Sequence, residues 1–130
     1  MPVADTSFIV DIIRHDTKAL AKLQELESEG KVLFITPINA LELFEGAYRS
    51  LRVKENVEEV LEVLAAFEEI PFGNDIYHAF GYLSAALLDK GSPVRDFDQV
   101  IAAAALCFDG EIVTRDGHFE KIPELTVIGY

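Results

Sequence analysis

Acidic residues that could bind a divalent cation stand at scattered positions of this 130-residue chain. Asp5 ends a short apolar run at the beginning of the sequence, and Asp98 opens an alanine-rich run that extends to Phe108. Asp116 stands just past a strand-like segment, Glu111–Thr114. If these runs belong to one parallel sheet with crossover helices, the three aspartates meet at one edge, because ligands bind at the carboxyl ends of parallel strands.

Glu42 is a further candidate, because it lies between Leu41 and Leu43 in an apolar segment where an isolated carboxylate is costly to bury. A partly exposed helix position explains Glu42 equally well, and each of the three aspartates could separately be a helix cap or a turn residue. Several carboxylates in one crevice repel each other unless they are protonated or bind a metal ion. Oxygen ligands suit Mg²⁺ or Mn²⁺, and the lack of a Cys/His cluster argues against zinc.

The composition limits the classes of protein to which this chain can belong. Half of the residues are hydrophobic and the mean hydropathy is +0.20, which predicts a single domain, residues 1–130, with a sizeable core. The net charge of −12 argues by itself against binding nucleic acid through a basic surface. No apolar run approaches the roughly 20 residues that cross a membrane, and the first residues lack a basic signal segment, so we expect a cytoplasmic location. Cys107 is expected to be buried.

Strands and helices alternate along the sequence, which predicts an α/β sandwich with a parallel sheet. Thr36 and Pro37 have the residue types of an N-cap and a first helical position. The expected strands span residues 2–5, 32–35, 70–72, 111–114 and 126–128, and the expected helices span residues 8–14, 17–29, 37–51, 54–69, 74–90 and 97–108. We expect the third helix to bury Ile38, Leu41, Phe44, Ala47, Tyr48 and Leu51, and its neighbours to bury Leu20 and Leu61.

Short segments spread along the whole chain, in order and at suitable spacing, resemble the PIN-domain family and most closely its VapC-type ribonuclease toxins. They are Asp5–Ser7, Glu42–Gly46, Asp96–Ala103, Thr114–Phe119 and Ile122–Pro123. The resemblance implies a PIN-like three-layer α/β sandwich with a short, mainly parallel central sheet. It implies that the metal-binding acids are Asp5, Glu42, Asp98 and Asp116, with Asp96 as a further candidate that matches the pattern less well than Asp98. The hydroxyl groups of Thr6, Ser7 and Thr114 would orient these acids.

The activity implied by the resemblance is a Mg²⁺-dependent endoribonuclease, with Mn²⁺ able to replace Mg²⁺, that hydrolyses phosphodiester bonds of RNA. Asp5 and Asp98 would be the main ligands, and Glu42 and Asp116 would complete the site or position the attacking water. Arginines would hold the flanking RNA backbone, namely Arg14, Arg49, Arg52, Arg95 and Arg115. The resemblance also implies a homodimer and a cognate antitoxin protein, for which the apolar helices at Leu20–Leu26 and Val57–Phe67 offer surface.

Other classes of function fit the residues alone. A non-catalytic α/β module that binds a metal or a partner would use the same acids as helix caps or as a regulatory metal site. A receiver-like domain would also place acids at the strand edge, but no lysine is well placed at the end of a late strand. His15 and His78 are expected on the surface, and His118, close to Asp116, is expected to be structural.

Overall fold

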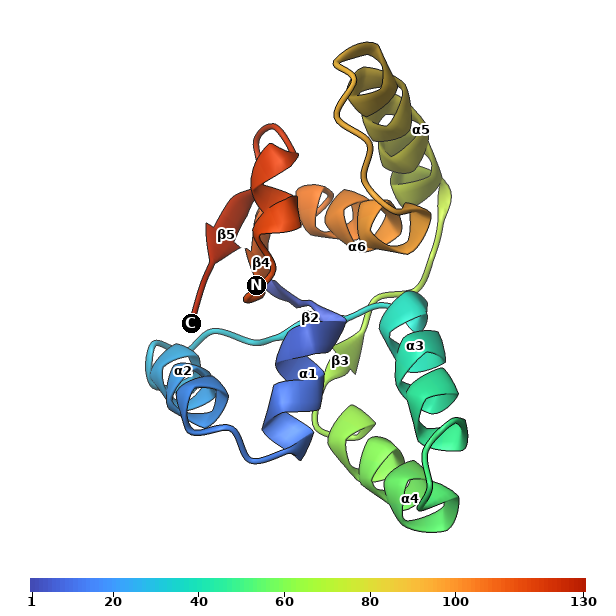
Figure 1. The fold of residues 1–130 in the computed structure, drawn as a ribbon. Coiled ribbons are helices and arrows are strands. Elements are labelled where there is room, and N and C mark those ends of the chain that lie inside the picture. Colours follow the sequence, from blue (N-terminus) through green and yellow to red (C-terminus); the bar gives the residue numbers. More distant parts are fainter.

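The computed structural model describes residues 1–130 and consists of a parallel five-stranded sheet between two layers of helices (Figure 1). The strands are β1 (Val3–Ala4), β2 (Phe34–Ile35), β3 (Glu68–Glu69), β4 (Glu111–Val113) and β5 (Thr126–Ile128). The helices are α1 (Thr6–Ile13), α2 (Thr17–Ser28), α3 (Pro37–Tyr48), α4 (Val53–Leu64), α5 (Asn74–Asp89) and α6 (Asp96–Leu106), with a 3₁₀ helix η1 at Gly117–Lys121. The predicted three-layer α/β architecture with a parallel central sheet is confirmed.

Successive residues of the central strands face opposite layers of the fold, because side chains alternate along a strand. Val3 of β1 pairs with Ile112 of β4, and both lie in the core formed with α5 and α6. Ala4 pairs with Val113, and both lie in the core formed with α1, α2, α3 and α4. The alanine run of α6 is fully buried, so this helix packs closely on the sheet. The two cores therefore hold the central strands rigidly from both sides.

Local signals fix several of the helix ends. Thr36 is the N-cap of α3 and accepts a hydrogen bond from the backbone N–H of Asn39, while the Asn39 side chain accepts one from the backbone N–H of Thr36. This reciprocal pair, with Pro37 at the first helical position, confirms the predicted beginning of α3. The Asp16 side chain caps α2, and Gly30 follows that helix with a positive φ of 76°.

The third strand and the helix before it differ from the sequence expectation. The helix predicted over residues 54–69 ends at Leu64, and the strand expected at 70–72 lies instead at Glu68–Glu69. These glutamates pair with Phe34 and Ile35 of β2, and β3 is an edge strand. Exposed charged side chains are common on edge strands because they discourage pairing with another chain. The sequence pattern instead predicted that Glu68 and Glu69 continue the preceding helix.

Several side chains expected in the core are exposed. The stripe predicted for α3 was wrong at three positions, because Leu41, Tyr48 and Leu51 are exposed and Leu43 is buried instead. Leu20 of α2 and Leu61 of α4 are also exposed rather than buried. Cys107 is exposed because it lies just past the last residue of α6. Gly73 is the N-cap of α5 and provides no side-chain cap. None of the helices has the length and apolar character that a membrane span requires.

Candidate active site

The two central strands of the sheet end beside each other at a reversal of strand order. The chain passes from β1 through β2 to the edge strand β3, and then returns to β4 on the other side of β1. In open α/β sheets, ligands bind outside the carboxyl ends of the strands at such a reversal. Asp5 directly follows β1 and Thr114 directly follows β4. The fold therefore brings the first and last of the candidate segments to the edge where ligands bind.

Asp5 is buried and is held in place by hydroxyl groups from both sides of this reversal. Its Oδ2 atom accepts hydrogen bonds from Ser7 and from Thr114, each at 2.8 Å. The backbone N–H of Asp5 donates to the carbonyl of Val113 at 2.9 Å, which continues the pairing of β1 with β4. The carboxylate orientation is therefore fixed by the sheet itself rather than by a mobile loop.

Glu42 is half-buried in the second turn of α3, and Thr6 at the beginning of α1 donates a hydrogen bond to its Oε1 atom at 2.7 Å. Asn39 is fully buried one turn earlier, and its amide group donates to the carbonyl of Ala4 at 3.1 Å and to Oγ1 of Thr6 at 3.0 Å. Because the Thr6 oxygen accepts from Asn39, the Thr6 hydrogen is left to point at Glu42. Asn39 thus fixes the donor that orients Glu42.

Asn39 was not among the residues predicted to be functional, although the sequence carries a signal at this position. Asn39 stands three positions after the N-cap Thr36, where a polar side chain closes a capping box. That pattern predicts the helix start, but it does not show that the amide also reaches β1 and α1. Only the tertiary structure brings those elements to it.

Asp98 is buried in the first turn of α6, and its hydrogen-bonding partner is Arg95. Both Nε and Nη2 of Arg95 contact the Oδ2 atom of Asp98, at 3.1 and 3.0 Å. The N-terminal turn of a helix carries partial positive charge, which favours a carboxylate there. Neither Asp96 nor Asp98 caps the helix, because the N-cap is Arg95 and it forms no side-chain cap. The pairing with Arg95 was not expected from the sequence.

Asp116 and Asp96 are less buried than Asp5 and Asp98. Asp116 begins η1, where its Oδ1 atom accepts from the backbone N–H of His118 at 2.9 Å and pairs with the His118 ring at 2.6 Å. Thr114 ties this turn to Asp5, because its hydroxyl oxygen also accepts from the backbone N–H of Asp116. Asp96 is exposed and forms neither a hydrogen bond nor an ion pair through its side chain. The structure thus links Asp116, and not Asp96, to the other candidate acids.

The candidate carboxylates influence one another electrostatically. Burial raises the pKa of Asp5, and the nearby charge of Asp98 raises it further, while the hydrogen bonds from Thr114 and Ser7 oppose the shift. Burial also raises the pKa of Glu42, opposed by the hydrogen bond from Thr6, and the charges of Asp98 and Asp5 add to the increase. The hydrogen bond to Asp98 raises the pKa of Arg95. Asp5, Glu42 and Asp98 therefore share one acidic site.

One carboxylate oxygen on each of these three residues is left without a side-chain partner: Oδ1 of Asp5, Oε2 of Glu42 and Oδ1 of Asp98. The only fully buried side-chain polar atom without a partner is Oε1 of Gln99, so the three free oxygens retain contact with solvent. As placed, no three acidic, His or Cys side chains form a group that could hold a metal ion. The residues fit Mg²⁺ in donor type and access, and binding would require them to close around the cation.

A third buried carboxylate, that of Asp11, was not singled out from the sequence. Asp11 of α1 accepts a hydrogen bond from the hydroxyl of Tyr130 at 2.6 Å and pairs with Nε of Arg115 at 2.7 Å. Burial and the hydrogen bond to Asp11 raise the pKa of Tyr130. Arg115 stands between Thr114 and Asp116, so this pair fastens the segment after β4 to α1. Asp11 carries a structural role next to the site.

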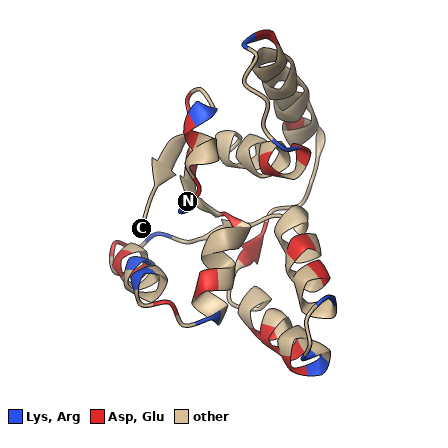
Figure 2. Cartoon of the chain, in the orientation of Figure 1, with Lys and Arg blue, Asp and Glu red and all other residues tan.

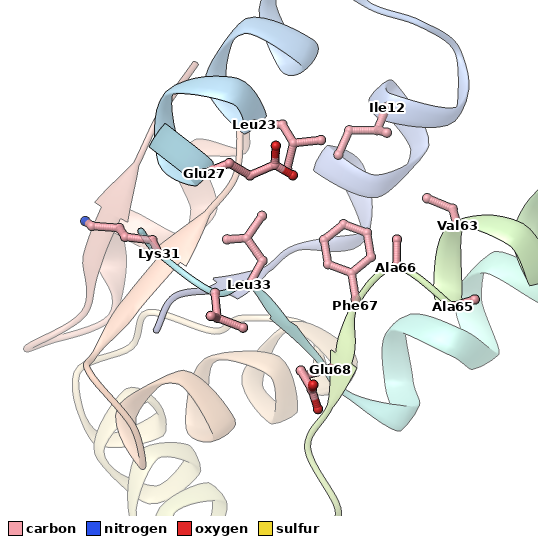
Figure 3. A pocket seen from close by; sticks show the side chains of 11 residues that line it. Ile12, Leu23, Glu27, Lys31, Leu33, Val63, Ala65, Ala66, Phe67 and Glu68 are labelled. Carbon is pink, nitrogen blue, oxygen red and sulfur yellow. The ribbon is translucent and has the colours of Figure 1, made fainter. Parts of the chain in front are cut away.

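Two of the three cavities beside α1 and α4 matter for the candidate site and its surroundings. One, of about 320 Å³, is mainly apolar and lies between α1, α2 and the end of α4, with Leu23, Leu33 and Phe67 around it (Figure 3). It is separate from the candidate acids, none of which lines it. The other, of about 340 Å³, is lined by Arg14 and Glu42, among other residues of α1, α3 and α4, and so opens beside the site.

Comparison with known proteins identifies the family. Residues 3–125 match the PIN domain family. The chain is 31% identical over 94 residues to the tRNA(fMet)-specific endonuclease VapC of Salmonella typhimurium, covering 72% of this chain and 71% of that protein. The chain therefore belongs to the PIN domain family, as the sequence motifs predicted.

Solved structures agree with this assignment. VapBC2 from Rickettsia felis, bound to a DNA fragment from its promoter, gives a TM-score of 0.89 at 25% identity and covers 98% of this chain and 96% of that chain. DNA-bound VapBC from Salmonella typhimurium gives a TM-score of 0.87 at 26% identity, with 99% of this chain and 98% of that chain covered. The likeness covers nearly the whole chain and shows that the fold is shared.

Proposed function

We propose that this protein is a Mg²⁺-dependent endoribonuclease and the toxin of a toxin–antitoxin pair. The observation that carries the proposal is the shared electrostatic site of Asp5, Glu42 and Asp98 at the reversal of strand order. The names of the relatives support it, because one is an endonuclease that acts on a tRNA and others are VapBC complexes. The metal, the RNA substrate and the roles of single residues are parts of this proposal.

In this proposal Asp5 and Asp98 are the main metal ligands, because both are buried and each keeps one oxygen in contact with solvent. A divalent cation held there would lower the pKa of a water molecule and stabilise charge on the phosphate. Glu42 completes the ligand set through Oε2, and Thr6 keeps its Oε1 engaged. Asp116 orients the attacking water at the rim, and Ser7 and Thr114 hold Asp5 in place.

The acidic surface does not conflict with an RNA substrate if the phosphate is drawn to a bound cation. Figure 2 shows acidic residues on α1, α3, α4 and α6 around the carboxyl edge of the sheet, with few basic ones among them. Arg49, Arg52 and Arg115 are engaged with acidic neighbours. Arg14 forms no ion pair and lines the cavity that opens beside Glu42. Arg14 is therefore the arginine best placed to contact the flanking RNA backbone.

The proposed antitoxin would contact the apolar cavity between α1, α2 and the end of α4 (Figure 3). Its lining includes Leu23, Val63 and Phe67, which lie in or next to the two helical segments expected from the sequence to face a partner. The proposed homodimer would form through a different surface, that of α5, on which Tyr77, Tyr82 and Leu88 are exposed. Sedimentation of the wild type and of Leu88→Glu tests this part, since a dimer that uses α5 should dissociate in the variant.

A non-catalytic module that binds a metal or a partner is the second candidate. The observation in its favour is that Asp98 is already paired with Arg95 and that the acids do not form a ready coordination group. Such a module would bind Mn²⁺ or a partner protein and leave RNA intact.

Cleavage of single-stranded RNA and of tRNA with Mg²⁺ separates the two candidates. The wild type should cleave, chelation should stop the reaction, and Asp98→Asn should lower the rate by roughly a hundredfold or more. Glu45→Gln is the control, because Glu45 is exposed on the same helix as Glu42 and pairs only with Arg49. If Asp98→Asn cleaves at the wild-type rate, or if the wild type binds metal and cleaves no RNA, the nuclease proposal fails.

A further inference from the structure

Arg95 reaches over a buried carboxylate from an exposed position. Its side chain is 77% exposed, whereas that of Asp98 is only 6% exposed. Two of its nitrogen atoms contact one oxygen, Oδ2 of Asp98, and no other side chain donates a hydrogen bond to Asp98. Burying a carboxylate without a hydrogen-bonding partner costs free energy, and Arg95 is the side chain that provides this partner for Asp98.

The charge of Arg95 acts on more than one acid of the site. It interacts favourably with Glu42 and Asp116 as well as with Asp98. Apart from His118, which pairs with Asp116 at the rim, no other basic side chain forms an ion pair with any of the candidate acids. Arg95 therefore supplies positive charge to Asp98 by direct contact and to Glu42 and Asp116 at longer range in the metal-free protein.

We propose that Arg95 is a built-in counter-cation of the metal-free site and that a divalent cation competes with it for Asp98. The inference rests on the proposed function, because it requires the same acids to bind a metal. A cation on the free Oδ1 atom would face the guanidinium on Oδ2 of the same carboxylate, and like charges repel at this range. The long, exposed side chain of Arg95 can move away, so metal entry replaces one cation by another.

The competition predicts that removing Arg95 strengthens metal binding. A hydrogen bond to a charged group can change an equilibrium constant by about tenfold, and exposure of Arg95 to solvent reduces this effect. Titration calorimetry with Mn²⁺ alone should therefore show roughly three- to tenfold tighter binding by Arg95→Gln than by the wild type. Arg95→Lys keeps the charge but not the two-nitrogen contact, so its affinity should lie between the two.

Arg52→Gln is a matched control. Arg52 is also the N-cap of its helix and pairs with an acid three positions later, Glu55, but that acid is exposed and belongs to α4. Its removal changes the net charge of the protein by the same amount as Arg95→Gln, and it should leave Mn²⁺ affinity unchanged.

A second measurement follows the folded state directly. Without metal, Arg95→Gln should melt at a lower temperature than the wild type, because Asp98 loses its partner. Saturating Mn²⁺ should raise its melting temperature by more than it raises that of the wild type, since the stabilisation by a ligand at a given concentration increases with the logarithm of its affinity.

The outcomes separate this inference from the proposed function. Mn²⁺ binding by the wild type with equal affinity in Arg95→Gln overturns the inference alone, and so does equal tightening in Arg52→Gln. If neither the wild type nor Arg95→Gln binds Mn²⁺, the inference and the proposed metal site fail together. If Arg95→Gln does not fold, Arg95→Lys decides: wild-type affinity in that variant overturns the inference.

Discussion

The hydroxyl of Thr114 donates a hydrogen bond to Oδ2 of Asp5 across 2.8 Å, although 109 positions separate the two residues in the sequence. The pairing of β1 with β4 brings them together, because Ala4 and Val113, the residues just before them, are partners in the sheet. Ser7 donates to the same oxygen. The carboxylate is thus oriented with one oxygen engaged and the other free for a ligand.

Replacement of Thr114 by valine should weaken metal binding without unfolding the protein. Valine has nearly the same shape but cannot hold Asp5, and loss of a residue that orients a metal ligand typically costs ten- to a hundredfold in affinity. We expect Mn²⁺ affinity, measured by titration calorimetry, to fall by about tenfold in Thr114→Val and to be largely kept in Thr114→Ser. Wild-type affinity in the valine variant would show that this hydroxyl does not orient a ligand.

Asn39→Ala should lower the free energy of unfolding by about 2 to 4 kcal/mol, because several buried hydrogen bonds are lost together. The amide of Asn39 bonds to Thr36, to the carbonyl of Ala4 and to Thr6, in a fully buried position. Urea denaturation measures the change. Asn74→Ala, at the exposed first position of α5, is the control and should change stability by less than about 0.5 kcal/mol. A similar small change in both variants would contradict this account of Asn39.

The fold could be predicted to a large extent because its determinants are local. Thr36 with Pro37 marks the beginning of α3, and Gly30 marks the end of α2, where a positive φ is needed. The edge strand β3 was harder to predict. Glu68 and Glu69 have the composition of a helix surface, and only their pairing with β2 makes them a strand. Which leucines of α3 are buried likewise depends on the helices packed against it, and α4 is one of them.

The position of the candidate site could be predicted from the sequence, but the side-chain contacts that hold its acids could not. Asp5, Glu42, Asp98 and Asp116 could be nominated because parallel strands and their helices converge at one edge, and their roles as metal ligands stay a prediction. The partners that hold them were not predictable, because Arg95 could have pointed to solvent and Asn39 could have served only as a cap. Side-chain pairings across elements depend on distances of a few ångströms that no sequence pattern specifies.

Tyr130→Phe should destabilise the protein by about 1 to 2 kcal/mol, because it removes a hydrogen bond to the buried carboxylate of Asp11. The ring packing against Phe8 is kept in this variant. Chemical denaturation measures the loss, and Tyr82→Phe is the control, since Tyr82 is exposed and forms no hydrogen bond. Equal stability of Tyr130→Phe and the wild type would mean that Arg115 alone satisfies Asp11.

The metal-free protein should lose stability as the pH rises through the raised pKa of Asp5. Burial raises this pKa, so the folded state favours the protonated form. Such a group stabilises the folded state fully below the ordinary aspartate pKa of about 3.9, and this stabilisation is lost as the pH passes the raised pKa. Asp5→Asn lacks this effect.

In chelator, the melting temperature of the wild type relative to Asp5→Asn should therefore fall as the pH rises above the ordinary aspartate pKa of about 3.9, and level off once the pH has passed the raised pKa. Differential scanning calorimetry across this range measures the difference, and acids that do not interact with Asp5 cancel in the comparison. A constant difference between the two melting temperatures would show that burial does not shift the pKa of Asp5.

The most direct test of the central claim is a crystal of this protein soaked in millimolar Mn²⁺ and measured for anomalous scattering. The account predicts a peak about 2.2 Å from carboxylate oxygens of both Asp5 and Asp98, with Arg95 turned away from Asp98. A fully soaked crystal with no anomalous peak beside these two residues, and with Arg95 still on Asp98, would contradict it.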